Sequence, residues 1–232
     1  MSTPPSPDGV PAFLDALRTH LAAERPWADV PAQDGAVSDS AVLALISGTS
    51  LDDAAILIEE RAHTMRSQPA QFALPGGRRD PGDATAEATA VRETWEEVGL
   101  SADRFTVLGA LPPVVLALRD IRVVPVIAWM PSAPASLTLS EAEVHRVLCP
   151  PLRGPGSLSD PAVVCWARAM GRSMGEAYDL PQDPDDPDDD AFVWGFTAGL
   201  LRRLLAAIDP SLVVEPTEER PVPAYRVWRP AG

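Results

Sequence analysis

The sequence predicts a protein of the α/β class, because apolar strand-like runs and segments with helical periodicity both recur along it. It has 232 residues, of which 46% are hydrophobic, and this is enough for one sizeable domain or a domain with an appendage. We expect a tail, a helix and a linker over residues 1–37, followed by the main domain over residues 38–232.

The first predicted element is an amphipathic helix over residues 11–24, in which Phe13, Leu17 and Leu21 are spaced four apart. Helices are also expected where apolar periodicity returns, over residues 85–98 and 192–208, with a short helix or turn at residues 139–147. Strands are expected in five apolar runs, at residues 40–47, 54–61, 105–111, 121–130 and 223–229.

Details of these runs predict how they connect. The strands at 40–47 and 54–61 are close enough to form a β-hairpin, whereas residues 62–83 look mostly irregular. Pro125 favours an edge strand or a bulge. The acidic segment at 181–191 resembles a solvated disordered loop more than a calcium site.

The charge of the chain limits the partners that it can bind. It has 33 acidic and 19 basic residues, which give a formal net charge of −14. This argues against nucleic acids and anionic membranes, since binding to either needs an excess of Lys and Arg. A small anionic substrate stays compatible, because a bound metal can supply positive charge locally.

Cysteine usage and the N-terminus predict the compartment. Cys149 and Cys165 form neither a metal-ligand pattern nor a disulfide framework. The first ten residues lack the basic and apolar regions of a signal peptide, and no apolar run reaches membrane-spanning length. We therefore expect a soluble cytoplasmic protein, for which a homodimer is a possible assembly.

Three glutamates crowd one short segment of the predicted helix at 85–98. Each helical residue turns the direction by about 100°, so Glu93, Glu96 and Glu97 share one face. Like charges one turn apart repel by a few tenths of a kcal/mol. Arg92 relieves part of this repulsion, and a hard divalent cation relieves far more, since Mg²⁺ and Mn²⁺ prefer carboxylate oxygens.

The alternative is a solvated surface helix, on which glutamates are common. The flanks of the segment weaken this alternative, because a Pro-Gly-Gly turn precedes the helix and Gly99 follows it. Both are constraints on backbone shape as well as on charge. Thr85 or Asp83 is expected to cap the N-terminus of the helix, and this role of Asp83 competes with a metal role.

Gly77, Asp83 and the run RETWEEVGL from Arg92 to Leu100 resemble the Nudix box, G-x5-E-x7-R-E-U-x-E-E-x-G-U. Asp83 replaces the first Glu of the box, and eight residues separate it from Arg92 instead of seven. Thr94 lies where an aliphatic residue is usual. The resemblance implies a Nudix α/β/α sandwich with a mixed β-sheet, to which the N-terminal helix is added.

The same resemblance implies the chemistry. Glu93, Glu96 and Glu97 would ligate Mg²⁺ or Mn²⁺, and Arg92 would orient their carboxylates through an ion pair. The metals of such enzymes bridge a diphosphate and activate water. Glu93, Glu97 and Arg92 are thus expected in the catalytic set. A general base from outside the box completes it, with Glu143 as the candidate and Glu141 as the runner-up, unless both only begin a surface helix.

Residues 57–77 resemble the signature that precedes the box in coenzyme A diphosphatases, L-L-T-x-R-S/A-x3-R-x3-G-x3-F-P-G-G. Ala70 replaces the glycine of the signature and Leu74 its phenylalanine, while Gln71 matches the glutamine that commonly follows that glycine. The residues in register are Leu57, Arg61, Ala62, Arg66, Pro75, Gly76 and Gly77.

This second resemblance implies a substrate. CoA or acyl-CoA would be hydrolysed to 3′,5′-ADP and (acyl-)4′-phosphopantetheine, with Arg61, Arg66, Gln71, Gly76 and Gly77 in contact with the substrate. The arginines would pair with phosphates such as the 3′-phosphate of CoA, unless they are only solvated or structural. ADP-ribose, NADH, dinucleoside polyphosphates and oxidised nucleotides are the alternative substrates, and a non-catalytic nucleotide sensor is the alternative class.

Overall fold

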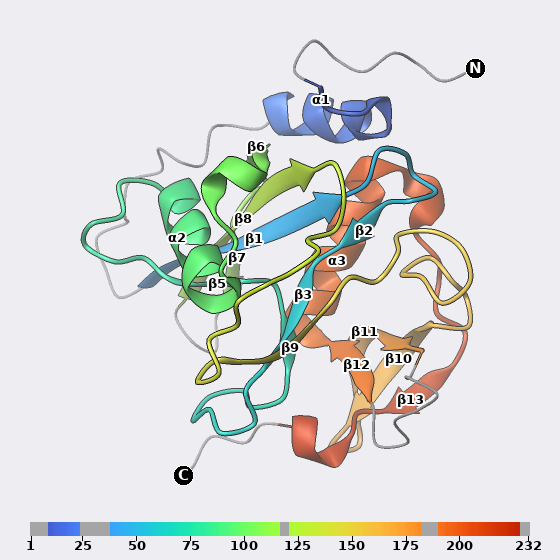
Figure 1. The fold of residues 1–232 in the computed structure, drawn as a ribbon. Helices are drawn as coiled ribbons and strands as arrows, with labels where there is room; N and C mark the ends of the chain where they lie inside the picture. Colours follow the sequence, from blue (N-terminus) through green and yellow to red (C-terminus); the bar gives the residue numbers. More distant parts are fainter. Residues whose placement is uncertain (1–8, 24–37, 117–120, 182–189, 228–232) are drawn as a thin grey trace. The chain divides into compact units, whose positions relative to one another are not determined.

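The computed structural model describes residues 9–23, 38–116, 121–181 and 190–227 (Figure 1). The chain forms two compact units, of which unit 1 comprises residues 1–49 and 74–140, and unit 2 residues 50–73 and 141–232. The predicted linker at 25–36 and most of the acidic segment at 181–191 lie outside the described residues. Among the described residues, the helices are too short or too polar to cross a membrane.

Unit 1 is built on a mixed β-sheet. Strand β1 is parallel to β8 and antiparallel to β5, while β8 is antiparallel to both β6 and β7. Most residues of β1 and β8 are buried, as expected for strands covered on both faces. The strands are β1 (Ser38–Ser47), β5 (Gly76–Arg78), β6 (Thr106–Ala110), β7 (Val114–Leu116) and β8 (Ile121–Met130).

Helices pack on this sheet. The N-terminal helix comprises η1 (Ala12–Leu14) and α1 (Asp15–Ala23), and α1 contacts β6. Helix α2 (Ala86–Val98) contacts β1, β5 and β8, and a short turn of helix, η3 (Ala102–Arg104), follows it. The predicted α/β class, the mixed sheet and the added N-terminal helix are confirmed.

The bounds of α2 follow from its two end residues. The Thr85 hydroxyl accepts a hydrogen bond from the Ala88 amide at 3.1 Å, and this caps the helix. Gly99 ends it in the left-handed conformation, with φ of 69°. The predicted helix is therefore confirmed, and Thr85 provides the side-chain cap at its N-terminus.

Pro125 lies inside the sheet, so its prediction as an edge residue is wrong. Strand β8 has β1 on one side and both β6 and β7 on the other. Pro125 faces Val42 of β1, and on the other side it lies where β6 has ended and β7 has not begun. Its carbonyl still accepts a hydrogen bond from the Leu111 amide at 2.9 Å. The missing amide of proline therefore falls at an interruption of the neighbouring ladder.

Unit 2 contains a three-stranded antiparallel sheet in the order β4-β3-β9. The strands are β3 (Ile58–Arg61), β4 (Phe72–Ala73) and β9 (Val144–Leu148), and the short β2 (Ala55–Ile56) precedes β3. The strand predicted over 54–61 divides in two: β2 is the neighbour of β1 in its sheet, as the predicted hairpin required, whereas β3 pairs with β4 and β9. The short helix or turn predicted at 139–147 is a turn at 141–143 followed by β9.

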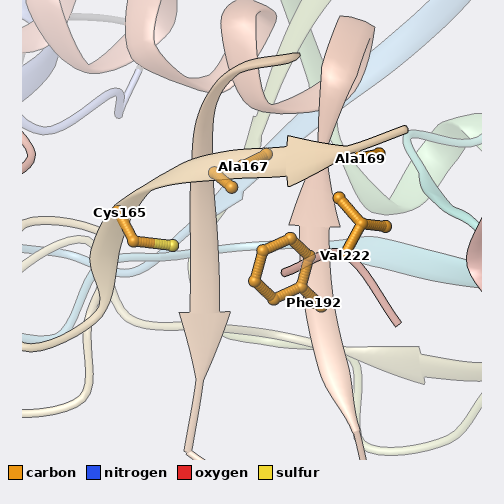
Figure 2. Packing of buried hydrophobic residues seen from close by; sticks show 6 residues of the cluster. Cys165, Ala167, Ala169, Phe192 and Val222 are labelled. Carbon is orange, nitrogen blue, oxygen red and sulfur yellow. The ribbon is translucent and has the colours of Figure 1, made fainter. Parts of the chain in front are cut away.

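A four-stranded sheet in the order β12-β11-β10-β13 forms the rest of unit 2. Helix α3 (Gly195–Ile208) packs on β11, β12 and η4 (Pro210–Leu212). Figure 2 shows the apolar cluster of this sheet, which includes Cys165, Ala167, Phe192 and Val222. The strands are β10 (Val164–Ala169), β11 (Arg172–Leu180), β12 (Ala191–Trp194) and β13 (Glu219–Pro221).

Two predictions in this part of the chain need correction. The helix expected over 192–208 begins only at Gly195, because the preceding residues form β12 and pair with β11. The strand expected at 223–229 is instead the short helix η5 (Ala224–Arg226) over its described residues. In both cases long-range pairing or packing, which local sequence does not encode, decides the conformation.

Candidate active site

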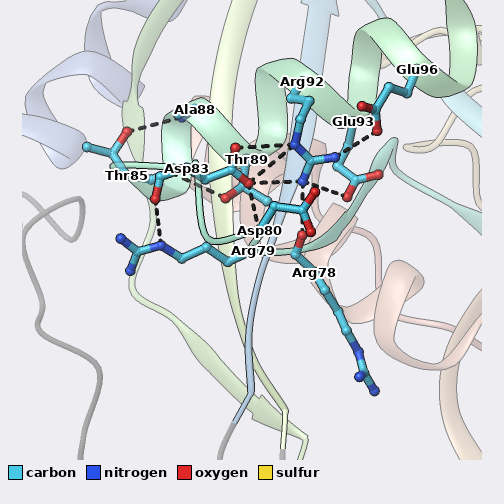
Figure 3. A network of polar contacts seen from close by, with 10 residues as sticks. All are labelled: Arg78, Arg79, Asp80, Asp83, Thr85, Ala88, Thr89, Arg92, Glu93 and Glu96. Carbon is cyan, nitrogen blue, oxygen red and sulfur yellow. Dashed lines mark hydrogen bonds and ion pairs between the residues drawn. The ribbon is translucent and has the colours of Figure 1, made fainter.

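Helix α2 and the loop before it bring four charged side chains together in unit 1 (Figure 3). The Arg92 guanidinium contacts a carboxylate oxygen of Asp83 at 2.9 Å, of Glu93 at 3.0 Å and of Glu96 at 2.7 Å. We call these four residues the Arg92 cluster. One cation therefore faces three carboxylates, two of which belong to the predicted metal ligands.

Asp83 is held by the loop backbone as well as by Arg92. Its carboxylate accepts from the Asp80 amide at 3.0 Å, and its carbonyl accepts from Arg79 Nε at 2.9 Å. Hydrogen bonding from Arg92 lowers the pKa of Asp83 to about 2, although burial acts in the opposite direction. The same hydrogen bond raises the pKa of Arg92 above its usual value. In the structure, Asp83 is thus an ionised partner that anchors Arg92.

Glu97 is held by the backbone of β5, which precedes α2. Its side chain is 3% exposed, and its Oε2 accepts from the Gly76 amide at 2.7 Å. At Gly77 a Cβ atom would lie 2.4 Å from Oε1 of Glu93. The absence of a side chain at Gly77 therefore lets β5 approach the carboxylates of α2, which explains why the loop needs glycine there.

The other predicted site residues lie in unit 2, around the beginning of β9. The Ala62 amide donates to the Glu143 carbonyl at 2.7 Å, and the Arg61 amide donates to the Gln71 carbonyl at 3.0 Å. The structure thus brings Arg61, Gln71 and Glu143 into one small sheet region. Arg66 follows on an exposed turn, and Glu141 is exposed as well.

Two details bear on substrate recognition in that region. Arg61 Nε is buried and has no hydrogen-bond acceptor among the described residues. Gln71 is oriented, since its Nε2 donates to the Arg226 carbonyl at 3.0 Å. Arg61 therefore retains a donor for an anionic partner, whereas Gln71 already uses part of its side-chain amide.

Sequence reasoning missed a second charged cluster, also in unit 2. Glu60 is 2% exposed and contacts His63 at 3.0 Å, Arg146 at 2.5 Å and Arg226 at 3.0 Å. With His145, whose ring lies 4.6 Å from that of His63, these residues form what we call the Glu60 cluster. The only signal in the sequence was the pair Glu59–Glu60 inside an otherwise apolar run, because a charge at a strand position needs a partner when buried.

Comparisons with known proteins decide the family. The model of the NUDIX domain matches residues 38–146 of the chain. An uncharacterized Nudix hydrolase, NudL, of Enterobacter sp. (strain 638) is 32% identical over 159 residues, which is 66% of this chain and 74% of that protein.

The chain belongs to the Nudix hydrolase family.

The chain is also similar to other Nudix proteins. NudL of Escherichia coli (strain K12) is 31% identical over 66% of this chain and 74% of its own length. Nudix hydrolase 3 of Caenorhabditis elegans is 32% identical over 50% of this chain and 49% of its own. A crystal structure of a Nudix hydrolase from M. smegmatis, RenU, has 27% identity and a TM-score of 0.41, with 50% of this chain and 79% of that chain covered.

This Nudix hydrolase is therefore an enzyme, a pyrophosphohydrolase that acts on nucleotide-linked substrates. Nudix hydrolases generally use divalent metals, and the donor set on α2 fits such an ion. Glu93, Glu96 and Glu97 supply only carboxylate oxygens, which hard divalent cations prefer. Asp83, Glu93 and Glu96 place three carboxylates around the Arg92 guanidinium, so carboxylates outnumber this cation.

Proposed function

We propose that this Nudix hydrolase cleaves the diphosphate of CoA or acyl-CoA, with 3′,5′-ADP and (acyl-)4′-phosphopantetheine as products. The observation that carries the proposal is the ungapped register between Leu57 and Gly77, which matches the coenzyme A diphosphatase signature immediately before the box.

The conformation of Ala70 supports this register. Ala70 replaces the glycine of the signature, yet its φ is 57°, in the left-handed region that favours glycine. Its amide donates to the Arg61 carbonyl at 3.2 Å, and its carbonyl accepts from Arg226. The backbone thus keeps the turn that a glycine would adopt without strain, and contacts within unit 2 hold it there.

In the proposed mechanism, Glu93, Glu96 and Glu97 would hold Mg²⁺ or Mn²⁺. Bound there, the ion would neutralise charge on the diphosphate and lower the pKa of water. The Gly76 amide fixes the buried carboxylate of Glu97, while Arg92 fixes Glu93 and Glu96. Asp83 in turn keeps Arg92 in place, so these carboxylates are oriented before substrate binds.

Substrate phosphates outside the diphosphate would be bound by arginines of unit 2. Arg61 offers the buried Nε that has no acceptor among the described residues, and Arg66 lies five residues further on an exposed turn. A guanidinium binds phosphate through a planar fork of donors, which suits the dianionic 3′-phosphate of CoA.

Glu143 would act as the general base that takes a proton from the attacking water. Its backbone is fixed, because its carbonyl accepts from the Ala62 amide at 2.7 Å, and its side chain is half-buried. Asp83 is a poor base, since its pKa of about 2 leaves little affinity for a proton at neutral pH.

A panel of diphosphates with Mg²⁺ or Mn²⁺ tests the substrate, with products identified by mass spectrometry. We expect CoA and acetyl-CoA to have the highest kcat/KM, compared with ADP-ribose, NADH, a dinucleoside polyphosphate and an oxidised nucleotide. A higher kcat/KM for any of these four would overturn the CoA assignment. Absence of turnover with every substrate and metal would instead favour a nucleotide sensor.

The role of Arg61 has a separate test. In Arg61→Gln, kcat/KM for CoA should fall about tenfold or more, whereas kcat/KM for 3′-dephospho-CoA should change little, because that substrate lacks the proposed partner. Arg172→Ala removes an exposed arginine from the same unit and serves as the control. Equal losses on both substrates would show that Arg61 has a structural role instead.

A further inference from the structure

Three side chains with metal-binding atoms converge at the paired ends of β3 and β9. Glu60 is in β3, His63 follows that strand, and His145 is in β9. Their ligand atoms all lie within 4.8 Å of one another, with Glu60 buried and both histidines exposed. None of the three belongs to the Nudix box, and the sheet brings them together because Arg61 pairs with Val144.

The carboxylate at the centre of this group is fixed in place. Arg146 Nε contacts Glu60 Oε2 at 2.5 Å, and Arg226 contacts Glu60 Oε1 at 3.0 Å. His63 Nε2 contacts the same Oε1 at 3.0 Å. A carboxylate that is held by its neighbours presents its remaining lone pairs in a defined direction, which is the function of outer partners in metal sites.

We propose that Glu60, His63 and His145 bind a divalent transition-metal ion of the zinc type. Two imidazoles and one carboxylate are a donor set that suits such ions, and it leaves coordination positions for water or another ligand. A tetrahedral centre with bonds of about 2.1 Å holds its ligand atoms about 3.4 Å apart. The contact of 3.0 Å between His63 and Glu60 is close to that spacing, and the exposed imidazole rings can rotate to complete it.

Charge determines which ions fit. Arg146 and Arg226 offset the negative charges of Glu60 and Asp190, whose Oδ1 lies 3.6 Å from Arg226 Nε. The site is therefore close to neutral and has no excess of carboxylates for Mg²⁺ or Mn²⁺. Affinity must come from the imidazole nitrogens, which favours Zn²⁺, Co²⁺, Ni²⁺ and Cu²⁺.

An anion is a weaker occupant of the same place. The two arginines already donate to protein acceptors: Arg146 to Glu60 and the Asp190 carbonyl, and Arg226 to the carbonyls of Ala70 and Asp190. An anion would also meet the carboxylate of Glu60. The exposed imidazoles remain as the accessible ligands, and their neutral form binds metal.

Titration of the full chain with Co²⁺ tests the proposal, with the visible absorption bands of the ion reporting ligation by nitrogen. Zn²⁺ affinity is measured in parallel by competition with a chromophoric chelator. We expect His63→Ala and His145→Ala each to weaken binding by at least about tenfold and to change the Co²⁺ spectrum. His20→Ala is the matched control, because His20 is the one histidine of the chain outside the proposed site and is exposed on α1.

A variant of the Nudix box distinguishes metal binding at this site from metal binding at the box. Glu93→Gln/Glu97→Gln should lose the proposed Mg²⁺-dependent turnover but retain the Co²⁺ spectrum and the Zn²⁺ affinity. The proposal would be overturned if His63→Ala and His145→Ala both retained the Co²⁺ spectrum and the Zn²⁺ affinity of the wild type. It would also be overturned if the box variant were the only one to lose these two properties. Circular dichroism of each variant verifies the fold, so a loss of binding is not mistaken for unfolding.

Discussion

The two charged clusters of this protein have opposite ratios of carboxylates to cations. In the Arg92 cluster one guanidinium faces the carboxylates of Asp83, Glu93 and Glu96. In the Glu60 cluster one buried carboxylate faces two guanidiniums and a histidine. The first cluster belongs to the Nudix box and has an excess of negative charge, whereas the positive and negative charges of the second nearly balance.

The two clusters are therefore expected to differ in role: the Arg92 cluster attracts a cation, whereas the Glu60 cluster stabilises the fold. A cluster with unneutralised carboxylates repels itself until a cation arrives, so its natural ligand is a hard divalent ion. A balanced buried cluster loses much stability if one member is removed, and an ion that binds there must draw its affinity from the exposed imidazole nitrogens. Variants in the Arg92 region should therefore affect turnover first, and variants of Glu60 should affect stability first.

The largest effect is expected for Glu97→Gln. Loss of one negative charge from the proposed metal ligands should lower kcat by at least about 10²-fold, while the acceptor for the Gly76 amide remains. Steady-state kinetics with Mg²⁺ measures the loss, and thermal melting should show a small change. Glu87→Gln, an exposed position in the first turn of α2, is the control. Normal Mg²⁺-dependent activity in Glu97→Gln would contradict the assignment of the box.

Glu60→Gln should lower the free energy of unfolding by about 3 kcal/mol, because it leaves two guanidiniums without their shared anion in a buried place. Urea denaturation measures it. Glu219→Gln removes an ion pair with Arg168 in which both side chains are half-exposed, and it should cost less than about 1 kcal/mol. Similar losses in the two variants would show that burial does not distinguish these pairs.

Asp83→Asn should destabilise the protein by about 1–2 kcal/mol at neutral pH. The pKa of folded Asp83 is about 2, below its usual 3.8, so its ion pair stabilises the protein fully above about pH 4. This contribution is lost as the pH falls from about 4 toward 2. Melting temperatures of both proteins between pH 6 and 2 should therefore converge at acid pH.

Asp52→Asn is the control for that series, since Asp52 is 86% exposed and lies 3.6 Å from Arg153. A constant difference between wild type and Asp83→Asn across the whole pH range would contradict the ionised pairing with Arg92.

The smallest effect is expected for Ala70→Gly. Relief of the left-handed strain, about 1 kcal/mol, is offset by a more flexible unfolded chain and a lost buried methyl group. The free energy of unfolding should change by less than about 0.5 kcal/mol. Ala62→Gly, at a buried position without positive φ, should cost about 1 kcal/mol in the same denaturation assay. Equal costs would mean that Ala70 is not strained.

Local signals in the sequence predicted what local forces determine. Helix α2 begins and ends where the Thr85 cap and Gly99 were expected, and Glu93 and Glu96 both contact Arg92. Pro125 could not be placed correctly from its own strand, because its tolerance depends on the break between β6 and β7. Likewise, nothing near Trp194 in sequence indicates that β11 pairs with it and delays the start of α3.

The Glu60 cluster shows why part of a site escapes such prediction. Its members come from β3, the turn after it, β9 and η5, and Glu60 pairs with Arg146, which is 86 residues further along the chain. Only the folded sheet makes them neighbours. The box glutamates, by contrast, lie within five residues on one helix, so their periodicity alone predicts a shared face.

Mass spectrometry of CoA incubated with Mg²⁺ and either wild-type protein or Glu97→Gln tests the central claim most directly. We predict equal amounts of 3′,5′-ADP and 4′-phosphopantetheine with the wild type, dependent on the metal, and almost none with the variant. Intact CoA with the wild type, under conditions in which it hydrolyses another diphosphate, would contradict the assignment of this Nudix hydrolase to coenzyme A.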